Sequence, residues 1–265
     1  MIVRHLETLD DRRLDPYRHL RTTNLTRFSG RFIAESRPLV RRLIDSPLDV
    51  ESVLIDASFL EEAATWMPEG IEVLAIGSEA ISELIGFHFH RGYLACGRRP
   101  QEAVWTSQPV APEWNGVMLV GVQDPENMGS ILRTCAALGI EDVLLGPECV
   151  DPFARRVLRV SMGNAFKQRF YKVLEAVETL RSLHASGVET LAACLSDDSI
   201  ELQQWKRIGP TAIVLGNEAH GLPPEVMRAA RHRLRIDMSL GTDSLNVSVA
   251  AAILLHYACR LASPA

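Results

Sequence analysis

The second half of the sequence contains three short segments in which Gly, Asn, Ser and acidic residues follow an apolar stretch. They are residues 121–139 (GVQDPENMGSILRTCAALG), 214–226 (VLGNEAHGLPPEV) and 236–255 (IDMSLGTDSLNVSVAAAILL). Their amide, hydroxyl and carboxylate groups can form hydrogen bonds with a ligand, and ligands in open α/β sheets gather at the carboxyl ends of strands. Glycines on either side of Glu218 would let the backbone approach a flat ligand closely. These segments are therefore the candidate site.

Taken singly, each segment has an ordinary structural interpretation. A Gly-rich turn after a strand is more often only a turn, a helical arginine such as Arg133 is usually ion-paired on the surface, and Asn246 at a helix start is usually a cap. The GxGxxG fingerprint of dinucleotide-binding folds and the GxxxxGK[ST] phosphate loop are both absent from the sequence. The assignment of a function therefore depends on the combination of the three segments.

The ordered set NxGxxxR, LGNExxGL and SLNVSVA resembles the three motifs of the SpoU family of SPOUT methyltransferases, and RVSMG at Arg159–Gly163 resembles a further element of that family. The resemblance covers residues 116–262. It implies an RNA 2′-O-ribose methyltransferase that moves a methyl group from S-adenosyl-L-methionine to a ribose 2′-hydroxyl of structured ribosomal or transfer RNA. It also implies a C-terminal trefoil knot and a homodimer with the active site near the interface, neither of which follows from periodicity.

The resemblance assigns roles to individual residues. The catalytic residues that it implies are Arg133, Asn127, Glu218, Ser244 and Asn246. The cofactor-binding residues that it implies are Leu215, Gly216, Asn217, Gly221, Ile236, Met238, Leu245 and Asn246. Arg133 would meet the 2′-oxygen and the adjoining phosphate. Because an arginine normally stays protonated, stabilisation of the developing alkoxide and proton abstraction by a strongly perturbed Arg133 both remain open.

One residue departs from the family pattern. The family usually has proline between the two apolar residues that open the third motif, whereas here Asp237 stands between Ile236 and Met238. A proline would fix φ and remove an N–H, so Asp237 predicts a less rigid loop with an added negative charge. We therefore expect this position to affect the affinity for the cofactor.

The apolar pattern predicts an α/β protein with two domains. In residues 1–108, apolar positions between 30 and 46 recur at helical spacing, and VESVLID, IEVLAIG and GYLACG are typical of short strands. This first domain resembles the small RNA-binding domain of the family. Two prolines and polar neighbours predict a linker at residues 106–115. Residues 116–265 form the expected SPOUT methyltransferase domain.

In this second domain, apolar strands alternate with helices. The strands expected are 117–122, 141–146, 188–195 and 211–216, and the helices expected are 127–138, 174–185 and 245–261. Asp151-Pro152 fits an N-cap followed by proline and predicts the start of another helix. Strands that are apolar along their whole length are typical of a parallel sheet covered by helices on both faces.

The formal net charge of −5 argues against binding of nucleic acid through overall charge. Residues 151–172 nevertheless hold six basic residues and one acid. Because clustered Lys and Arg bind phosphates, the RNA-binding residues that we expect are Arg155, Arg156, Arg159, Lys167 and Arg169. A solvated helix face is the alternative interpretation of this cluster.

Cysteine spacing and hydropathy limit the other possibilities. The five cysteines are scattered singly without a CxxC pair, which predicts reduced thiols and no metal site. No run approaches the roughly 18–20 apolar residues of a membrane span, and the N-terminal 13 residues lack the apolar stretch of a signal peptide. We therefore expect a cytoplasmic protein without a membrane partner.

Three other functions compete with an RNA ribose methyltransferase. A catalytically inactive SPOUT-like RNA-binding protein would keep the basic residues and lose the catalytic set, but Arg133, Glu218 and Asn246 are all present. A SPOUT enzyme that methylates a base is disfavoured, because SLNVSVA resembles the signature of the ribose methylators. A metabolic α/β enzyme would fit the negative net charge but would leave the first domain unexplained.

Overall fold

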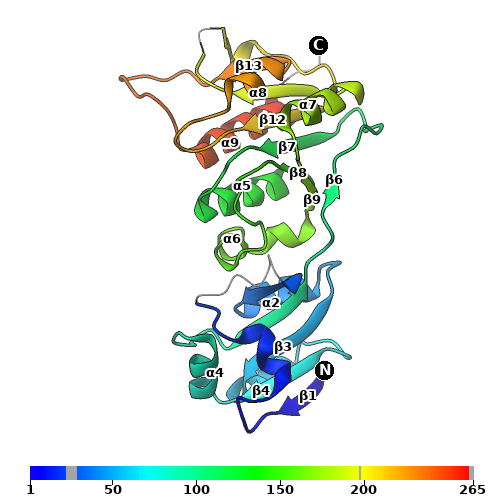
Figure 1. Cartoon of the computed structure of the whole chain (residues 1–265), viewed down its shortest axis with the longest axis vertical. Helices are drawn as coiled ribbons and strands as arrows, with labels where there is room; N and C mark the ends of the chain where they lie inside the picture. Colours follow the sequence, from blue (N-terminus) through cyan, green and yellow to red (C-terminus); the bar gives the residue numbers. More distant parts are fainter. Residues whose placement is uncertain (22–28, 197, 263–265) are drawn as a thin grey trace. The chain divides into compact units, whose positions relative to one another are not determined.

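The computed structural model describes residues 1–21, 29–196 and 198–262. Within these residues the chain folds into two compact units. The first unit contains Met1–Gln101 and Asp151–Phe166, and the second contains Glu102–Val150 and Lys167–Ala265. Each unit combines a β-sheet with helices, so the α/β class predicted from the sequence is confirmed (Figure 1).

The first unit is built around a five-stranded mixed sheet with the strand order β1-β4-β3-β5-β2. Its strands are β1 (Ile2–His5), β2 (Arg31–Glu35), β3 (Val50–Asp56), β4 (Glu72–Ile76) and β5 (Tyr93–Arg98). Strands β1, β4 and β3 run parallel, whereas β5 is antiparallel to both β3 and β2. Its helical elements are η1 (Arg12–Tyr17), α2 (Arg37–Ile44), η2 (Ala57–Phe59), α3 (Leu60–Ala64), α4 (Ser78–Ile85) and α6 (Arg155–Val160).

The inserted segment Asp151–Phe166 packs into the first unit through aromatic rings. Phe153 and Phe166 lie against Phe32 of β2, with ring centroids 4.9 and 5.6 Å from that of Phe32. All three rings are buried. Residues 151–166 thus contribute to the core of the first unit, and the domain bounds expected from the sequence stay a prediction.

The second unit is built around an eight-stranded sheet in the order β11-β13-β10-β12-β7-β8-β9-β6. Its strands are β6 (Ala103–Val104), β7 (Asn115–Leu119), β8 (Asp142–Leu145), β9 (Arg169–Lys172), β10 (Glu189–Ala193), β11 (Ile200–Glu201), β12 (Thr211–Leu215) and β13 (His232–Arg235). Every pairing between these strands is parallel, so the predicted parallel sheet is confirmed.

Helices cover both faces of this sheet. They are α5 (Pro125–Leu138), α7 (Ala176–Ala185), α8 (Pro224–Ala229) and α9 (Val247–His256), joined by the shorter turns η3 (Asn164–Lys167), η4 (Leu202–Gln204) and the π-helical η5 (Tyr257–Leu261). The pair α5 and α9 and the pair α7 and α8 each pack together (Figure 1). No helix among the described residues is both long enough and apolar enough to cross a bilayer.

The strand order brings several carboxyl ends together. Strands β7, β8 and β9 lie side by side in chain order. Strand β10 lies on the other side of β7, and β12 lies between β7 and β10. Ligands in open α/β sheets bind at such crossover points, outside the carboxyl ends of the strands. The trefoil knot that the family resemblance implies stays a prediction.

Two expected elements are wrong in detail. Residues 31–35 form strand β2 and not the start of a helix, because Pro38 lies in the first turn of α2 and ends the helical pattern there. The helix expected at Asp151-Pro152 begins only at Arg155. The Asp151 carboxylate instead accepts a hydrogen bond from the N–H of Phe153 at 2.9 Å and closes a turn.

Candidate active site

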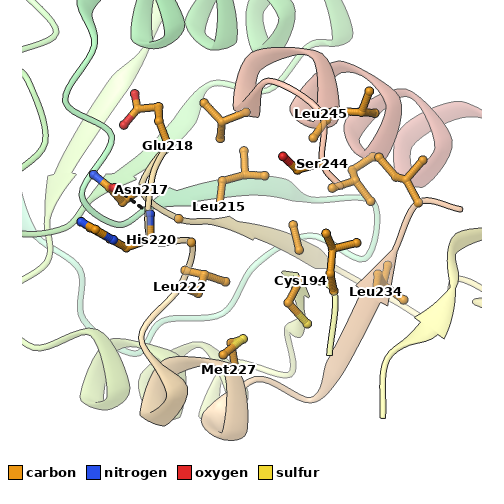
Figure 2. Close-up of a pocket in the computed structure, with 18 of the residues that line it drawn as sticks. Cys194, Leu215, Asn217, Glu218, His220, Leu222, Met227, Leu234, Ser244 and Leu245 are labelled. Atoms are coloured by element: carbon orange, nitrogen blue, oxygen red, sulfur yellow. Dashed lines mark hydrogen bonds between the residues drawn. The ribbon is translucent and has the colours of Figure 1, made fainter. Parts of the chain in front are cut away.

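A pocket of about 500 Å³ opens in the second unit where the carboxyl ends of β10, β12 and β13 meet the start of α9; we call it the β12 pocket. Figure 2 shows Leu215 at its centre, with Ser244 and Leu245 on one side and Leu222 and Met227 on another. Most of the walls are apolar. Small-molecule sites are hollows of this size that are lined mainly by apolar side chains with a few polar groups.

Glycine shapes the loop after β12 that forms one rim of the pocket. Asn217 and Gly221 close this loop through two backbone hydrogen bonds of 3.0 and 2.9 Å. A Cβ on Gly216 would lie 2.3 Å from the carbonyl carbon of Gly221, so any larger residue must displace backbone. The Asn217 side chain holds the turn by accepting hydrogen bonds from the N–H groups of Ala219 and His220 at 2.9 and 3.1 Å.

The carboxylate of Glu218 links this loop to the start of α5. It accepts hydrogen bonds from the N–H groups of Gln123 and Asp124 at 3.3 and 3.1 Å, and from Nδ2 of Asn127 at 3.1 Å. Oδ1 of Asn127 in turn accepts from Nδ2 of Asn246 at 2.9 Å. A single chain of hydrogen bonds therefore joins the three segments that the sequence singles out.

These hydrogen bonds also set the charge of Glu218. Burial is the largest single influence and raises the pKa of the carboxyl group, but the donors at Asn127, Asp124 and Gln123 together lower the pKa below its ordinary value of 4.5. Glu218 is therefore ionised at neutral pH. A carboxylate with a low pKa and three donors is a poor proton acceptor and a good anchor.

Side-chain caps fix the helices that carry Asn127 and Asn246. Oδ1 of Asp124 accepts from the N–H groups of Glu126 and Asn127 at the start of α5. Oδ1 of Asn246 accepts from the N–H and hydroxyl of Ser248 at 2.8 and 2.7 Å at the start of α9. Asn246 is thus both a cap and a member of the hydrogen-bond chain, so the two interpretations made from the sequence do not exclude each other.

Arg235 holds the loop between β13 and α9 from the outside. Its guanidinium donates to the carbonyl of Ser199, lies 3.3 Å from Glu201, and lies 3.4 Å from Asp237. The charge of Asp237, which replaces the usual proline, is therefore shared with a neighbouring cation. Met238, one residue further on, lines the β12 pocket.

Most of the expected site residues meet in one place. The expected residues that line the β12 pocket are Leu215, Gly216, Asn217, Glu218, Gly221, Ile236, Met238, Ser244 and Leu245. Asn127 is hydrogen-bonded to Glu218, and Asn246 is hydrogen-bonded to Asn127. The roles assigned to these residues stay predictions, although the structure brings the residues together.

Arg133 is the exception. It is exposed on α5 and is not among the residues that line the β12 pocket. Arg133 follows Asn127 by six residues. On an α-helix this separation places the two side chains about 120° apart around the axis and about 9 Å apart along it. The two side chains therefore leave α5 in different directions.

The apolar walls of the pocket are the part that the sequence did not reveal. They include Cys194, Leu222, Met227, Leu234, Ala250 and Leu254. These residues come from α8, β13, α9 and the loops after β10 and β12, and apolar residues in such places normally indicate only a core. His220, at the tip of the loop after β12, also belongs to the lining of the pocket.

A second hollow, of about 980 Å³, lies on the other side of the same loop; we call it the acidic hollow. Its acidic residues are Asp124, Glu148, Glu175, Glu218 and Glu225. No Lys or Arg is among the described residues that line it, so it disfavours phosphate. Across the described part of the chain, no group of three or more His, Cys, Asp or Glu side chains could hold a metal ion.

The expected RNA-binding residues divide between the two units. Arg155, Arg156 and Arg159 line a small hollow of the first unit. Arg169, on β9 of the second unit, lies 2.7 Å from Asp142 and 2.8 Å from a further carboxylate, Glu141. Its hydrogen bond to Asp142 raises the pKa of Arg169, so its charge is locally compensated. Lys167 is exposed at the end of η3.

Comparison with known proteins identifies the family that this site defines. The chain belongs to the SpoU rRNA Methylase family, which matches residues 115–256. It is similar to an uncharacterized tRNA/rRNA methyltransferase of Mycobacterium tuberculosis, with 35% identity over 263 residues that cover 95% of this chain and 90% of the relative. It is also similar to the 23S rRNA (guanosine-2′-O-)-methyltransferase RlmB of Acinetobacter baylyi, with 31% identity over 73% of this chain and 80% of RlmB.

Solved structures are similar over the whole chain. The AdoMet-bound rRNA methyltransferase from Sinorhizobium meliloti has a TM-score of 0.83 and 26% identity, and the similarity covers 97% of this chain and 98% of that one. A TrmH-family RNA methyltransferase from Porphyromonas gingivalis has a TM-score of 0.80 and 28% identity over 96% of this chain. The family and the α/β architecture predicted from the three motifs are therefore confirmed.

Proposed function

We propose that this chain is an RNA 2′-O-ribose methyltransferase that moves the methyl group of S-adenosyl-L-methionine to a ribose 2′-hydroxyl of structured ribosomal or transfer RNA. The observation that carries the proposal is the chain of hydrogen bonds from Glu218 through Asn127 to Asn246, to which each motif contributes one residue. The printed names of RlmB and of the AdoMet-bound neighbour support the same chemistry.

The β12 pocket fits the cofactor in size and in chemistry. Its volume of about 500 Å³ lies within the range of small-molecule sites. Among the described residues, the main-chain groups of Met238 and Leu245 make no backbone hydrogen bond, so both are available to the polar edges of the adenosine and methionine parts. The apolar walls suit the flat adenine ring. When bound, the cofactor supplies an electrophilic methyl group on a sulfonium.

The residues around the pocket act mainly by positioning. Alignment of the acceptor oxygen with the methyl carbon and the sulfur can supply about 7–11 kcal/mol of the barrier. The amides of Asn127 and Asn246 are each fixed by hydrogen bonds at both atoms, and the second N–H of each Nδ2 can donate to a ribose oxygen. Glu218 holds this arrangement through its ionised carboxylate and takes no proton from the substrate.

Arg133 is the group that stabilises the developing alkoxide, and we place it in the site through a second copy of the chain. It does not line the β12 pocket of its own chain, and the acidic hollow beside Asn127 offers no cation to a phosphate. Val249 and Ile253 leave an apolar strip exposed on α9, which packs against α5. A homodimer that buries this strip would bring the partner's Arg133 to the hydroxyl.

The first unit supplies the affinity for RNA. Residues 1–108 form the proposed RNA-binding domain and residues 116–265 the proposed methyltransferase domain, whose segment 151–166 packs with the first unit. Arg155, Arg156, Arg159, Lys167 and Arg169 are the proposed phosphate contacts. The location that we propose for such an enzyme is the cytoplasm. A catalytically inactive RNA-binding protein is disfavoured, because the catalytic set and a pocket of the right size are both retained.

The decisive experiment treats total RNA with the enzyme and labelled cofactor, followed by mass spectrometry of the nucleosides. We expect label in 2′-O-methylated nucleosides and in alkali-resistant dinucleotides. Arg133→Ala should keep its affinity for S-adenosylhomocysteine in calorimetry and lose methyl transfer, whereas Arg181→Ala, on the exposed face of α7, should change neither. Label on a base, or full turnover by Arg133→Ala, would contradict the proposal.

Mixed dimers test whether the partner supplies Arg133. Arg133→Ala and Gly216→Ala each inactivate the enzyme, and in a mixed dimer one site would combine an intact loop with an intact Arg133. Random mixing of the two variants in a symmetric dimer should therefore restore about a quarter of wild-type turnover. If Arg133 acted in its own chain, every site of the mixed dimer would be incomplete and no activity would return.

A further inference from the structure

The first unit contains a hollow of about 330 Å³ that we call the arginine pocket. The residues that form it include Glu35, Phe87, His90, Arg91, Arg155 and Arg159. It lies where β2, the loop after α4 and the inserted helix α6 meet, and all of these elements belong to one unit. The three motifs do not include this region. It therefore requires an explanation apart from methyl transfer.

Glu35 organises the cations of the pocket. Its carboxylate, only 6% exposed at the end of β2, lies 3.5 Å from Arg91, 3.7 Å from Arg155 and 3.9 Å from Arg159. One carboxylate cannot neutralise three guanidinium groups, so these four side chains carry a net charge of about +2. Glu35 thus fixes the cluster and leaves it positive.

The ion pairs in this pocket are long. Elsewhere in the same unit, Arg31 and Arg98 lie 2.6 and 2.8 Å from the carboxylate of Glu51 and donate hydrogen bonds to it. The distances of 3.5 to 3.9 Å around Glu35 exceed those of such charge-assisted hydrogen bonds. One N–H of Arg155 donates to the carbonyl of Leu20, and Nε of Arg91 donates to Nε2 of His90. The remaining N–H groups of these guanidinium groups can turn to another anion.

Flat groups lie beside the cations. The guanidinium carbon of Arg155 lies 5.1 Å from the centre of the half-buried Phe87 ring. The rings of His88 and His90 stack at 6.0 Å. Burial lowers the pKa of Arg155; the nearby Glu35 carboxylate opposes this shift, and Arg159 adds a smaller lowering. The cation is therefore partly removed from water, where an anion binds it more strongly.

We infer that the arginine pocket binds one unpaired nucleotide of the RNA substrate, with its phosphate on the guanidinium groups and its base against Phe87 and His90. Arginine forks match phosphate oxygens, and bases splayed out of single-stranded loops stack on aromatic and guanidinium planes. A volume of about 330 Å³ suits a mononucleotide and excludes a duplex. The inference rests on the proposed function only in taking RNA as the substrate.

The test compares binding of a labelled 12-nucleotide single-stranded RNA and a 12-base-pair RNA duplex to the full chain by fluorescence anisotropy. Arg91→Gln and Phe87→Leu should each weaken single-strand binding by about tenfold, as loss of a stacking or phosphate partner does. Arg91→Lys, which keeps the charge and loses the fork, should give an intermediate loss. Arg4→Gln, an exposed arginine of the same unit with a single carboxylate partner, is the matched control and should change nothing.

Each result decides one part of the inference. Thermal unfolding of every variant separates lost binding from lost folding, and Phe87→Leu is the milder substitution if Arg91→Gln unfolds. In a second measurement, a 4-thiouridine oligonucleotide should cross-link at Phe87 or His90. Unchanged affinity of the pocket variants, equal losses in Arg4→Gln, or cross-links only elsewhere would overturn the inference.

The proposed function can fail separately. If wild-type protein bound single-stranded RNA through this pocket but methylated no RNA, the methyltransferase proposal would fail and the pocket would stand. If it methylated ribosomal RNA while the pocket variants bound as wild type, the pocket inference alone would fail.

Discussion

The β12 pocket of the second unit and the arginine pocket of the first are both hollows beside strand ends, but they are made from different parts of the chain. Backbone forms the rim of the β12 pocket: Gly216 passes against Gly221, and Asn217 holds a turn through main-chain N–H groups. Side-chain charge forms the arginine pocket, where three guanidinium groups gather around the buried Glu35.

This difference indicates what each pocket can recognise. A rim of backbone and apolar walls selects a ligand by shape and by fixed donors and acceptors, so its affinity should depend on Cβ atoms and little on salt. A cluster of guanidinium groups selects a ligand by charge, so its affinity should depend on ionic strength and little on the loss of a methyl group.

Gly216→Ala should abolish useful cofactor binding. The new Cβ would lie 2.3 to 2.4 Å from backbone atoms of Gly221 and Leu222, so the loop must move. Overpacking costs about 1–3 kcal/mol, occasionally more, and we expect a loss of affinity of about 100-fold, since about 1.4 kcal/mol corresponds to tenfold. Calorimetry with S-adenosylhomocysteine measures it. Gly209→Ala, where a Cβ meets nothing within 4 Å, is the control, and equal affinities of the two variants would contradict the shape argument.

The two pockets should also differ in their response to salt. Each phosphate that an arginine neutralises on a single strand adds about 0.7 to the negative slope of log affinity against log salt. The one phosphate held in the arginine pocket therefore contributes a loss of roughly threefold between 50 and 200 mM salt for single-stranded RNA, and Arg91→Gln should reduce the slope by at most about 0.7. Affinity for S-adenosylhomocysteine should change little over the same range. Parallel slopes for the two ligands would remove the distinction between the pockets.

The sequence predicted the β12 pocket better than the arginine pocket for a physical reason. The rim of the β12 pocket requires special residues at fixed spacing, and Gly216, Glu218 and Asn246 are such residues. The arginine pocket joins Glu35 and Arg91 to residues of an inserted helix more than sixty positions away along the chain. Only the tertiary fold brings the residues of the arginine pocket together, and no short stretch of sequence predicts their contact.

The fold shows the same limit. The strands β7, β8, β10 and β12 are mainly apolar and were predictable, because burial on both faces of a parallel sheet favours such a sequence. Strand β2 was not predictable in this way, because Phe32 and Ile33 also continue the helical spacing of the residues after Pro38. The contacts of Phe153 and Phe166 with Phe32 depend on tertiary packing alone.

Glu218→Gln should reduce turnover by about tenfold, because hydrogen bonds to a charged acceptor are worth about 1.5–3 kcal/mol when buried and less at an exposed group. The substitution should also change how the free energy of unfolding depends on pH in the acidic range. The folded-state pKa of Glu218 lies below 4.5, so its contribution to stability is present above pH 4.5 and is lost as pH falls through the lower folded value. Unfolding measured between pH 6 and pH 3 should be less steep in the variant. An identical pH dependence would show that the carboxylate is not anchored.

The smallest expected effect concerns the one residue that departs from the family pattern. In Asp237→Pro, the loop before α9 would lose conformational freedom and one negative charge. Proline at a compatible position gains about 0.4–1 kcal/mol by restricting the unfolded chain, and a loop ordered in advance binds its ligand better. We therefore expect affinity for S-adenosylhomocysteine to rise by about two- to fivefold. Asp237→Asn separates the two causes, because it removes the charge facing Arg235 and leaves the backbone free. If Asp237→Asn raised the affinity as much as Asp237→Pro, the charge at position 237 and not the backbone would control this loop. Ligand affinity at the β12 pocket would then depend on charge, as we expect for the arginine pocket, and the distinction between the two pockets would fail.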